Sequence, residues 1–492
     1  MSIIRATYHS LSLQLDRMIR SISLSNPIVL SVIGLIGLMV AALIAVLDLK
    51  LGMLLMATTI GIPVIYLCFI NLRFGLVVTL GVAILIPFIG KFVAAPVGLA
   101  LDGLLFLMIF SLIIAQSKER NWEFAKNPIS YMILIWVMYN FIQVLNPVAE
   151  SKMAWVYTVR TLAIYNFLFF VAAYAMGSLR QIKNMIKVVV IVAFISCLYG
   201  LKKEFIGFSS AELAWLYADE KRFQLIVQWG RFRIFSFFSD PTTYGILMAY
   251  MGTFCLVLAM GPFKVWQRIS LAIAAILMFM AMVYAGSRTP FVLVPAGILF
   301  YILVTMKKEL LIGGAIFILF GTAAMMKSTS NPVIYRLQSA FRPTEDASVK
   351  VRLDNQAKVQ PFIQSHPIGA GLGSTGMWGE RFTPDSWLAS FAHDSSFVRF
   401  AVEAGWLGLI LFMLMLFVVM RMALYYHFRC YDPQIKTIYL GLAVVVFMLG
   451  LASYPQEVIP IPPTSIIFFI ILGAIVRLKD FDTQKPVTDV QK

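Results

Sequence analysis

Long apolar runs, each close to the length of a membrane span, fill most of this 492-residue chain. A helix needs about 20 apolar residues to cross the hydrocarbon of a bilayer. Short polar turns and two long polar gaps separate the runs. The pattern predicts an all-α polytopic membrane protein with about 14 transmembrane helices, or about 12 in the alternative count. The predicted spans are Pro27–Leu49, Leu51–Asn71, Phe74–Ala94, Val97–Gln116, Pro128–Leu145, Val156–Met176, Ile182–Leu201, Thr242–Met260, Ile269–Ala285, Pro290–Met306, Leu310–Met326, Phe397–Met420, Thr437–Ala452 and Ile459–Val476.

The basic residues indicate which way the spans run. Lys and Arg gather in alternate segments between spans, and the short loops on the other side hold few of them. The positive-inside rule therefore predicts cytoplasmic N and C termini and places both long gaps outside. The resulting segments are a cytoplasmic N-terminal part (1–26), N-terminal helices (27–201), a first outer loop (202–241), central helices (242–326), a second, catalytic outer loop (327–395), C-terminal helices (396–477) and a cytoplasmic tail (478–492).

Composition supports the membrane class. The chain is 60% hydrophobic and only 13% charged, with a mean hydropathy of +0.85, which excludes an ordinary soluble protein. Its net charge of +16 is explained by topology signals and by sites for anionic lipid or phosphate, so no nucleic-acid partner is expected. The four cysteines form neither a disulfide framework nor a zinc motif, and no metal or cofactor is expected.

Arginines on the outer side are the first candidate site residues. Arg231 and Arg233 end the first outer loop, just before a span, and Arg288 lies in the very short outer turn Gly286–Pro290. Arginine suits bidentate binding of phosphate oxygens. Contact with lipid headgroups is the alternative for each of them. For Arg231 and Arg233 the two readings stay open. For Arg288 we prefer a functional role, because two separate arginine sites then converge on one side of the membrane.

The second outer loop holds further candidates. Arg352 lies in the amphipathic stretch Val351–Gln364, which leads into the glycine-rich segment His366–Ser374. A flexible or tight-turn loop explains the glycines better than a nucleotide site, since no strand–turn–helix unit surrounds them. Further on, His393 and Asp394 precede a span.

His393 can titrate near neutral pH, and Asp394 or Glu403 could orient it or replace it as a base. A polar helix start with Asp394 or Ser395 as N-cap is the plainer alternative. Within the spans, Asp102 and Arg160 are costly in lipid. They either pair with each other or serve function.

Together these motifs resemble the O-antigen ligase and O-antigen polymerase superfamily of bacterial membrane glycosyltransferases. Four elements in order carry the likeness, each written with its residues. They are Arg233-x-x-Ser236-x-Phe238-x-Asp240-Pro241, Ser287-Arg288 at a tight turn, Arg352 followed by His366-Pro367-Ile368-Gly369-x-Gly371-x-Gly373, and the His393-Asp394 pair leading into Glu403-x-Gly405-Trp406-Leu407-Gly408. One position departs from the pattern: the family's histidine corresponds to Asp394, so His393 lies one residue early and the base is either of the two.

The resemblance implies an inverting, metal-independent glycosyltransferase of the bacterial inner membrane whose active site faces the periplasm. The donor would be an undecaprenyl-pyrophosphate-linked oligosaccharide, and the acceptor a sugar hydroxyl of a glycan or of the lipid A core. Arg233 and Arg288 would stabilise charge on the leaving pyrophosphate, supported by Arg231, Arg352, Arg160, Asp102 and Glu403. A chain-length regulator is a further expected partner, besides membrane lipid.

Surface polysaccharide synthesis of this kind includes O-antigen, capsule and exopolysaccharide. The offset histidine favours a polymerase slightly over a ligase. A transporter, such as a flippase for lipid-linked oligosaccharides, is the alternative from another class, although the two halves of the chain show no internal repeat.

Overall fold

A computed structural model describes residues 49–93, 97–228, 230–309, 312, 347–391 and 395–482. The predicted segment 1–26, nearly all of the span Pro27–Leu49 and most of the span Leu310–Met326 lie outside these residues. So do His393, Asp394 and the tail from residue 483. The chain divides into two units, Met1–Leu67 and Cys68–Lys492. All the sites discussed below belong to the second unit.

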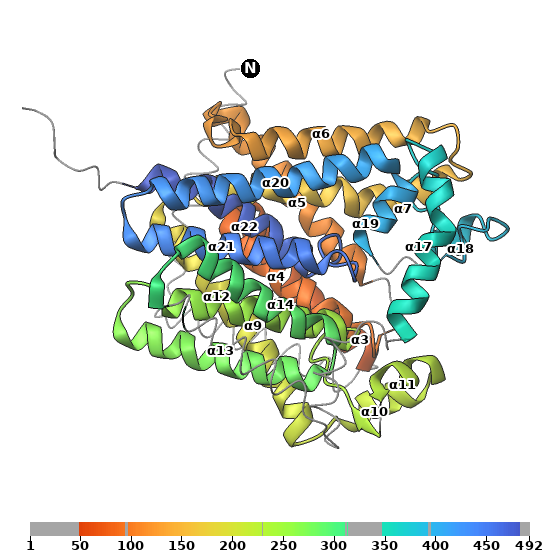
Figure 1. The fold of residues 1–492 in the computed structure, drawn as a ribbon, viewed down its shortest axis with the longest axis horizontal. Helices are drawn as coiled ribbons and strands as arrows, with labels where there is room; N and C mark the ends of the chain where they lie inside the picture. Colours follow the sequence, from red (N-terminus) through yellow and green to blue (C-terminus); the bar gives the residue numbers. More distant parts are fainter. Residues whose placement is uncertain are drawn as a thin grey trace, which may run out of the picture. The chain divides into compact units, whose positions relative to one another are not determined.

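The described residues are almost entirely helical (Figure 1). The α-helices are α3 (Leu49–Ile70), α4 (Leu72–Ile89), α5 (Gly98–Glu119), α6 (Pro128–Ile142), α7 (Lys152–Leu162), α8 (Leu168–Ala175), α9 (Leu179–Phe205), α10 (Ser210–Tyr217), α11 (Glu220–Ile226), α12 (Pro241–Ala259), α13 (Val265–Ala285), α14 (Arg288–Thr305), α17 (Ala347–Ser365), α18 (Gly376–Phe382), α19 (Ser396–Glu403), α20 (Gly405–Arg429), α21 (Pro433–Ala452) and α22 (Thr464–Leu478). Short 3₁₀ helices are η1 (Glu123–Ala125), η2 (Gln143–Leu145), η3 (Ile164–Phe167) and η5 (Lys479–Phe481), and the strands β1 (Val227–Gln228) and β2 (Arg231–Phe232) form an antiparallel pair.

Ten helical stretches among the described residues are long and apolar enough to cross a membrane. This agrees with a polytopic membrane protein. Local sequence fixes where several of them begin. Asn127, Ser178 and Asp240 each accept a hydrogen bond from a backbone N–H of the first turn, and proline follows directly at the start of α6 and α12. Such caps satisfy donors that have no partner inside the helix.

The centre of the second unit is formed by α12, α21 and α22. The apolar stretch of α12 is 83% buried and that of α21 is 72% buried, against 33% for α13 and α20. Nearly every residue of α22 is buried as well. The outer helices instead expose apolar side chains such as Ile269, Ile273 and Phe417, as expected of surfaces that face lipid.

Within the second unit, the described parts of the two long polar segments lie at the same end of the helices (Figure 1). We call this the loop end; it carries α10, α11, α17 and α18. The opposite end carries the short connections 120–127, 176–178, 260–264 and 430–432, and we call it the basic end. Which side of the membrane each end faces stays a prediction.

Two predicted spans are interrupted. The predicted span Phe397–Met420 is wrong at its beginning, because α19 ends at Glu403 and a new helix starts at Gly405. Gly405 has φ +71°, and a Cβ there would lie 2.1 Å from the carbonyl oxygen of Pro367. The chain thus turns where another segment packs against its backbone. In the predicted span Val156–Met176, η3 separates α7 from α8, but the three together form one stretch, Lys152–Ala175, that is long and apolar enough to cross a membrane.

Candidate functional site

Arg233 joins the first long loop to the turn that contains Arg288. Its side chain is buried, with Nε donating to the carbonyl oxygen of Ala285 at 3.0 Å and Nη1 donating to that of Leu225 at 3.2 Å. Ala285 ends α13, directly before Gly286, Ser287 and Arg288. The two predicted phosphate-binding segments, 55 residues apart by number (288 − 233), therefore meet at the loop end.

Two helices begin at this same place. The hydroxyl of Ser287, which precedes α14, donates to the hydroxyl of Thr242 in the first turn of α12 at 3.3 Å. Arg288 is the first residue of α14 and is partly buried. Helix N-termini carry partial positive charge from their unpaired N–H groups. Arg288 thus adds a full positive charge to two N-termini that lie side by side.

Arg231 makes a different contact. Its Nη2 forms an ion pair with Glu204 at 2.8 Å, linking β2 to the end of α9, and about half of its side chain is exposed. The pairing of β1 with β2 places Arg231 opposite Gln228. The contact gives Arg231 a structural role in the first loop.

A buried ion pair that the sequence analysis did not identify lies under the first long loop. Lys203 and Glu212 approach to 2.6 Å with fully buried side chains, and Lys203 also donates to the carbonyl oxygen of Ser236. Lys91 lies nearby, with its amine over the rings of Phe235 and Trp215 at 4.4 and 5.3 Å. This cluster anchors the first loop to the ends of α4 and α9.

Glu403, a predicted alternative base, is buried in a charge network. Its carboxylate accepts a hydrogen bond from Thr375 at 2.6 Å and pairs with Arg399 at 3.3 Å. Arg399 also pairs with Glu457. Burial alone would lower the pKa of Arg399, but the carboxylates of Glu403 and Glu457 raise it. These contacts hold α19 against the segment that follows α21.

The glycine-rich segment is a set of tight turns. Gly369, Gly371 and Gly373 all have positive φ, and added Cβ atoms would lie 2.4–2.5 Å from neighbouring atoms. The backbone N–H of Ala370 donates to Val402, and that of Gly371 donates to the carbonyl oxygen of Glu403. The segment is therefore hydrogen-bonded to the α19–α20 junction. Its close packing there leaves no room for a nucleotide.

The remaining predicted residues have separate positions. Arg160 and Asp102 pair with each other at 2.7 Å, and the Tyr165 hydroxyl also donates to Asp102 at 2.8 Å. This is the structural alternative considered above. Arg352 lies on α17, partly buried, and its supporting role stays a prediction.

His393 and Asp394 lie outside the described residues, but the residues after them are placed. The backbone N–H of Ser396 donates to the carbonyl oxygen of Ser453 at 3.0 Å, and the Ser395 hydroxyl contacts the same oxygen. Ser395 also caps α19 through Val398. Ser395 and Ser396 thus lie at the loop end of α21, a helix that packs against α12 and α14.

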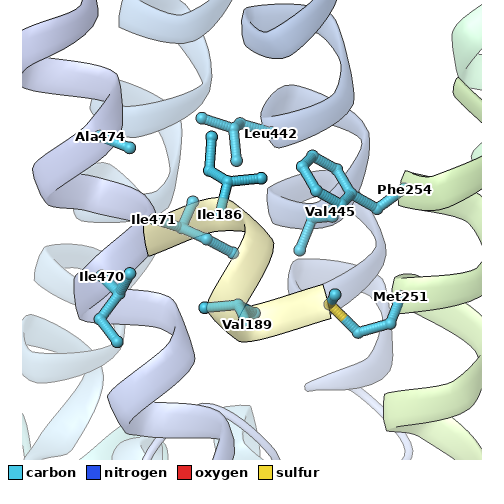
Figure 2. A pocket seen from close by; sticks show the side chains of 9 residues that line it. All are labelled: Ile186, Val189, Met251, Phe254, Leu442, Val445, Ile470, Ile471 and Ala474. Carbon is cyan, nitrogen blue, oxygen red and sulfur yellow. The ribbon is translucent and has the colours of Figure 1, made fainter. Parts of the chain in front are cut away.

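The interior between the helices is apolar. Figure 2 shows nine side chains from α9, α12, α21 and α22 around a void of about 20 Å³, all of them aliphatic, aromatic or methionine. Such a void offers no partner for a polar ligand. Polar chemistry in this region is therefore confined to the ends of the helices.

Within the described ranges, no three His, Cys, Asp or Glu side chains gather as metal ligands would.

Sequence reasoning missed Arg399, Glu457 and Thr375. The i,i+4 spacing of Arg399 and Glu403 was a visible signal for an ion pair on one helix face. Glu457 gave no such signal, because it lies 58 residues beyond Arg399.

The apolar helices define a multi-pass membrane protein, and at its loop end Arg233 meets the turn that leads into Arg288. The O-antigen ligase family model matches residues 273–413, a stretch that includes Arg288, Arg352 and Glu403. The match covers this part of the chain and supports the resemblance to the O-antigen ligase and O-antigen polymerase superfamily that the motifs suggested. A comparison with curated proteins finds no match.

Proposed function

We propose that this protein is an inverting glycosyltransferase that moves a glycan from undecaprenyl pyrophosphate to an acceptor sugar hydroxyl. The observation that carries the proposal is the meeting of Arg233 with the α13–α14 turn, which puts two arginines and two helix N-termini at one place. The family match over residues 273–413 supports the reaction class.

The chemistry needs positive charge at the leaving group. As the glycosidic bond to the lipid pyrophosphate breaks, negative charge develops on phosphate oxygens. Arg288, at the start of α14, would contact that charge directly. Arg233 adds its own charge and, through Ala285, holds the turn in place. Preorganised cations in a site of low dielectric stabilise such a transition state.

The acceptor hydroxyl must lose a proton as it attacks the anomeric carbon from the opposite face. His393 or Asp394 would take it, and the attack inverts the anomeric centre. Glu403 is a weaker candidate for this base, because Thr375 and Arg399 already occupy its carboxylate. No step of this scheme requires a metal.

We further propose that the enzyme acts in the bacterial inner membrane with the loop end in the periplasm. There it would build a surface polysaccharide, with polymerisation favoured over ligation to the lipid A core because of the offset histidine. A chain-length regulator would then be a partner.

Transfer by purified full-length protein from a defined lipid-linked donor tests the proposal. Arg288→Ala should lower the rate by about 10²–10³-fold, the usual effect of removing one charge-stabilising donor. Lys221→Ala removes a charge from the same loop end and serves as the matched control, because Lys221 is exposed. Full transfer by Arg288→Ala would overturn the pyrophosphate role. Lipid movement without any transfer by the wild type would instead favour a flippase.

The base is tested separately with His393→Ala and Asp394→Ala in the same assay. We expect one of the two to abolish transfer without lowering the melting temperature. If both retain the wild-type rate, the base lies elsewhere.

A further inference from the structure

We propose that the basic end of the helices holds a membrane phospholipid with an anionic headgroup, in a groove between α9, α13 and α21. The groove has a volume of about 490 Å³. That size is typical of pockets for small ligands. The groove lies at the opposite end of the helices from Arg233 and Arg288, so this proposal does not depend on the proposed reaction.

The wall of the groove is apolar. Ile186, Val190 and Ile191 of α9 face it together with Phe263 and Leu271, and it opens beside α13. Next to it, α13 exposes Ile269, Ile273 and Ile276, each by more than half. Acyl chains have a continuous apolar surface here, running along the helix toward the centre of the membrane.

The rim of the groove is basic. Lys183, Lys187 and Lys264 line it, and no Asp or Glu does. Lys187 and Lys264 are exposed, and none of the three lysines makes an ion pair in the described part of the chain. Three amines without a carboxylate in the lining make the rim electropositive, and a phosphodiester headgroup supplies a matching charge.

The rim is also rigid. The Lys183 amine donates to Oε1 of Gln434 at 2.6 Å, and Nε2 of Gln434 donates to the carbonyl oxygen of Pro262 at 3.1 Å. Gln434 thus ties α9 and the 260–264 connection to α21. Trp266 at the same level is 65% exposed, as expected of an indole ring at the membrane–water boundary.

Native mass spectrometry of the purified full-length protein tests the proposal. Phosphatidylglycerol and phosphatidylethanolamine with acyl chains of different mass are added together in equal amounts. We expect wild-type protein to retain phosphatidylglycerol in preference. Lys187→Gln/Lys264→Gln removes two exposed charges and leaves the Lys183–Gln434 bond intact, so it should fold. Each lysine near a membrane surface contributes about a fivefold preference for the anionic lipid. The preference of the double variant for phosphatidylglycerol over phosphatidylethanolamine should therefore be about 25-fold lower than that of the wild type.

Lys126→Gln is the matched control, because Lys126 is an exposed lysine at the same end, paired with Glu123 outside the groove. It should keep the wild-type preference. The proposal is overturned if wild-type protein retains the two lipids equally, or if the control loses as much preference as the double variant. Unchanged preference in the double variant would also overturn it.

Discussion

Arg399 shows how much a single buried side chain can hold together at the loop end. Its guanidinium lies between Glu403, which is on its own helix, and Glu457, which follows α21. Removing one partner of a buried pair leaves uncompensated charge, whereas an exposed pair contributes little. Arg399 and Arg231 therefore form an informative contrast, since Arg231 pairs with Glu204 while half exposed.

Arg399→Met is expected to destabilise the protein by about 3–5 kcal/mol, because two carboxylates stay behind in a buried site. Thermal unfolding in detergent measures this as a large drop in melting temperature. Arg231→Met is the control, with an expected change below about 1 kcal/mol. Similar small shifts for both variants would contradict the network.

Lys91 gives a prediction about pH. Burial, together with the charge of Lys203 and against the opposing charge of Glu212, lowers the pKa of Lys91 to about 7. Its amine has no hydrogen-bond partner among the described residues. In the unfolded chain the pKa of this lysine is near 10.5. Between about pH 7 and 10.5 the unfolded chain therefore binds the proton more readily than the folded chain does. Lys91 thus costs stability in full below pH 7, and the cost falls as pH rises through that window.

Lys91→Met should raise the melting temperature at about pH 6, and the gain should shrink by about pH 9. Scanning fluorimetry of both proteins in the same detergent measures the difference. A gain that is constant with pH would contradict an amine with a lowered pKa.

At the scale of elements, the glycine-rich segment fixes where α20 begins. Gly371 has φ +94°, and a Cβ there would lie 2.5 Å from the Cβ of Ala149. The segment also receives hydrogen bonds from Asn146 and Gln143, which follow α6. Three distant parts of the chain are thus held at one junction.

Gly371→Ala is expected to destabilise the protein by about 2 kcal/mol or more, through backbone strain and overlap together. Gly103→Ala is the control, because a Cβ at Gly103 in α5 meets nothing within 4 Å. Melting temperatures of the two variants give the comparison. Equal tolerance of both would mean that the segment does not pack as described.

At the scale of the whole molecule, the prediction is that the two ends face opposite sides of the membrane. All four native cysteines are buried, so single introduced cysteines can be labelled selectively. We expect Trp387→Cys, at an exposed position of the loop end, to react in intact cells with a membrane-impermeant maleimide. Lys264→Cys should react only after the membrane is permeabilised. Reaction of both in intact cells would contradict the orientation.

Helix positions were largely predictable from sequence. An apolar run of sufficient length must bury its backbone polar groups in its own hydrogen bonds, whatever its neighbours are. The described helices α4, α5, α9, α12 and α13 accordingly overlap their predicted spans. The break at Gly405 was not predictable, because it depends on the packing of Pro367 against the backbone of that residue.

Sequence by itself thus determined that the chain is a polytopic membrane protein, which superfamily it resembles, and which arginines to examine. Hydropathy, charge bias and short motifs are local properties, so they can be read without the fold. Only the tertiary structure decided which side chains meet. Arg233 reaches the turn before Arg288, Asp102 pairs with Arg160, and Glu403 is enclosed by Thr375 and Arg399. Such contacts join residues far apart along the chain, and their partners are set by how helices pack rather than by the sequence around each residue.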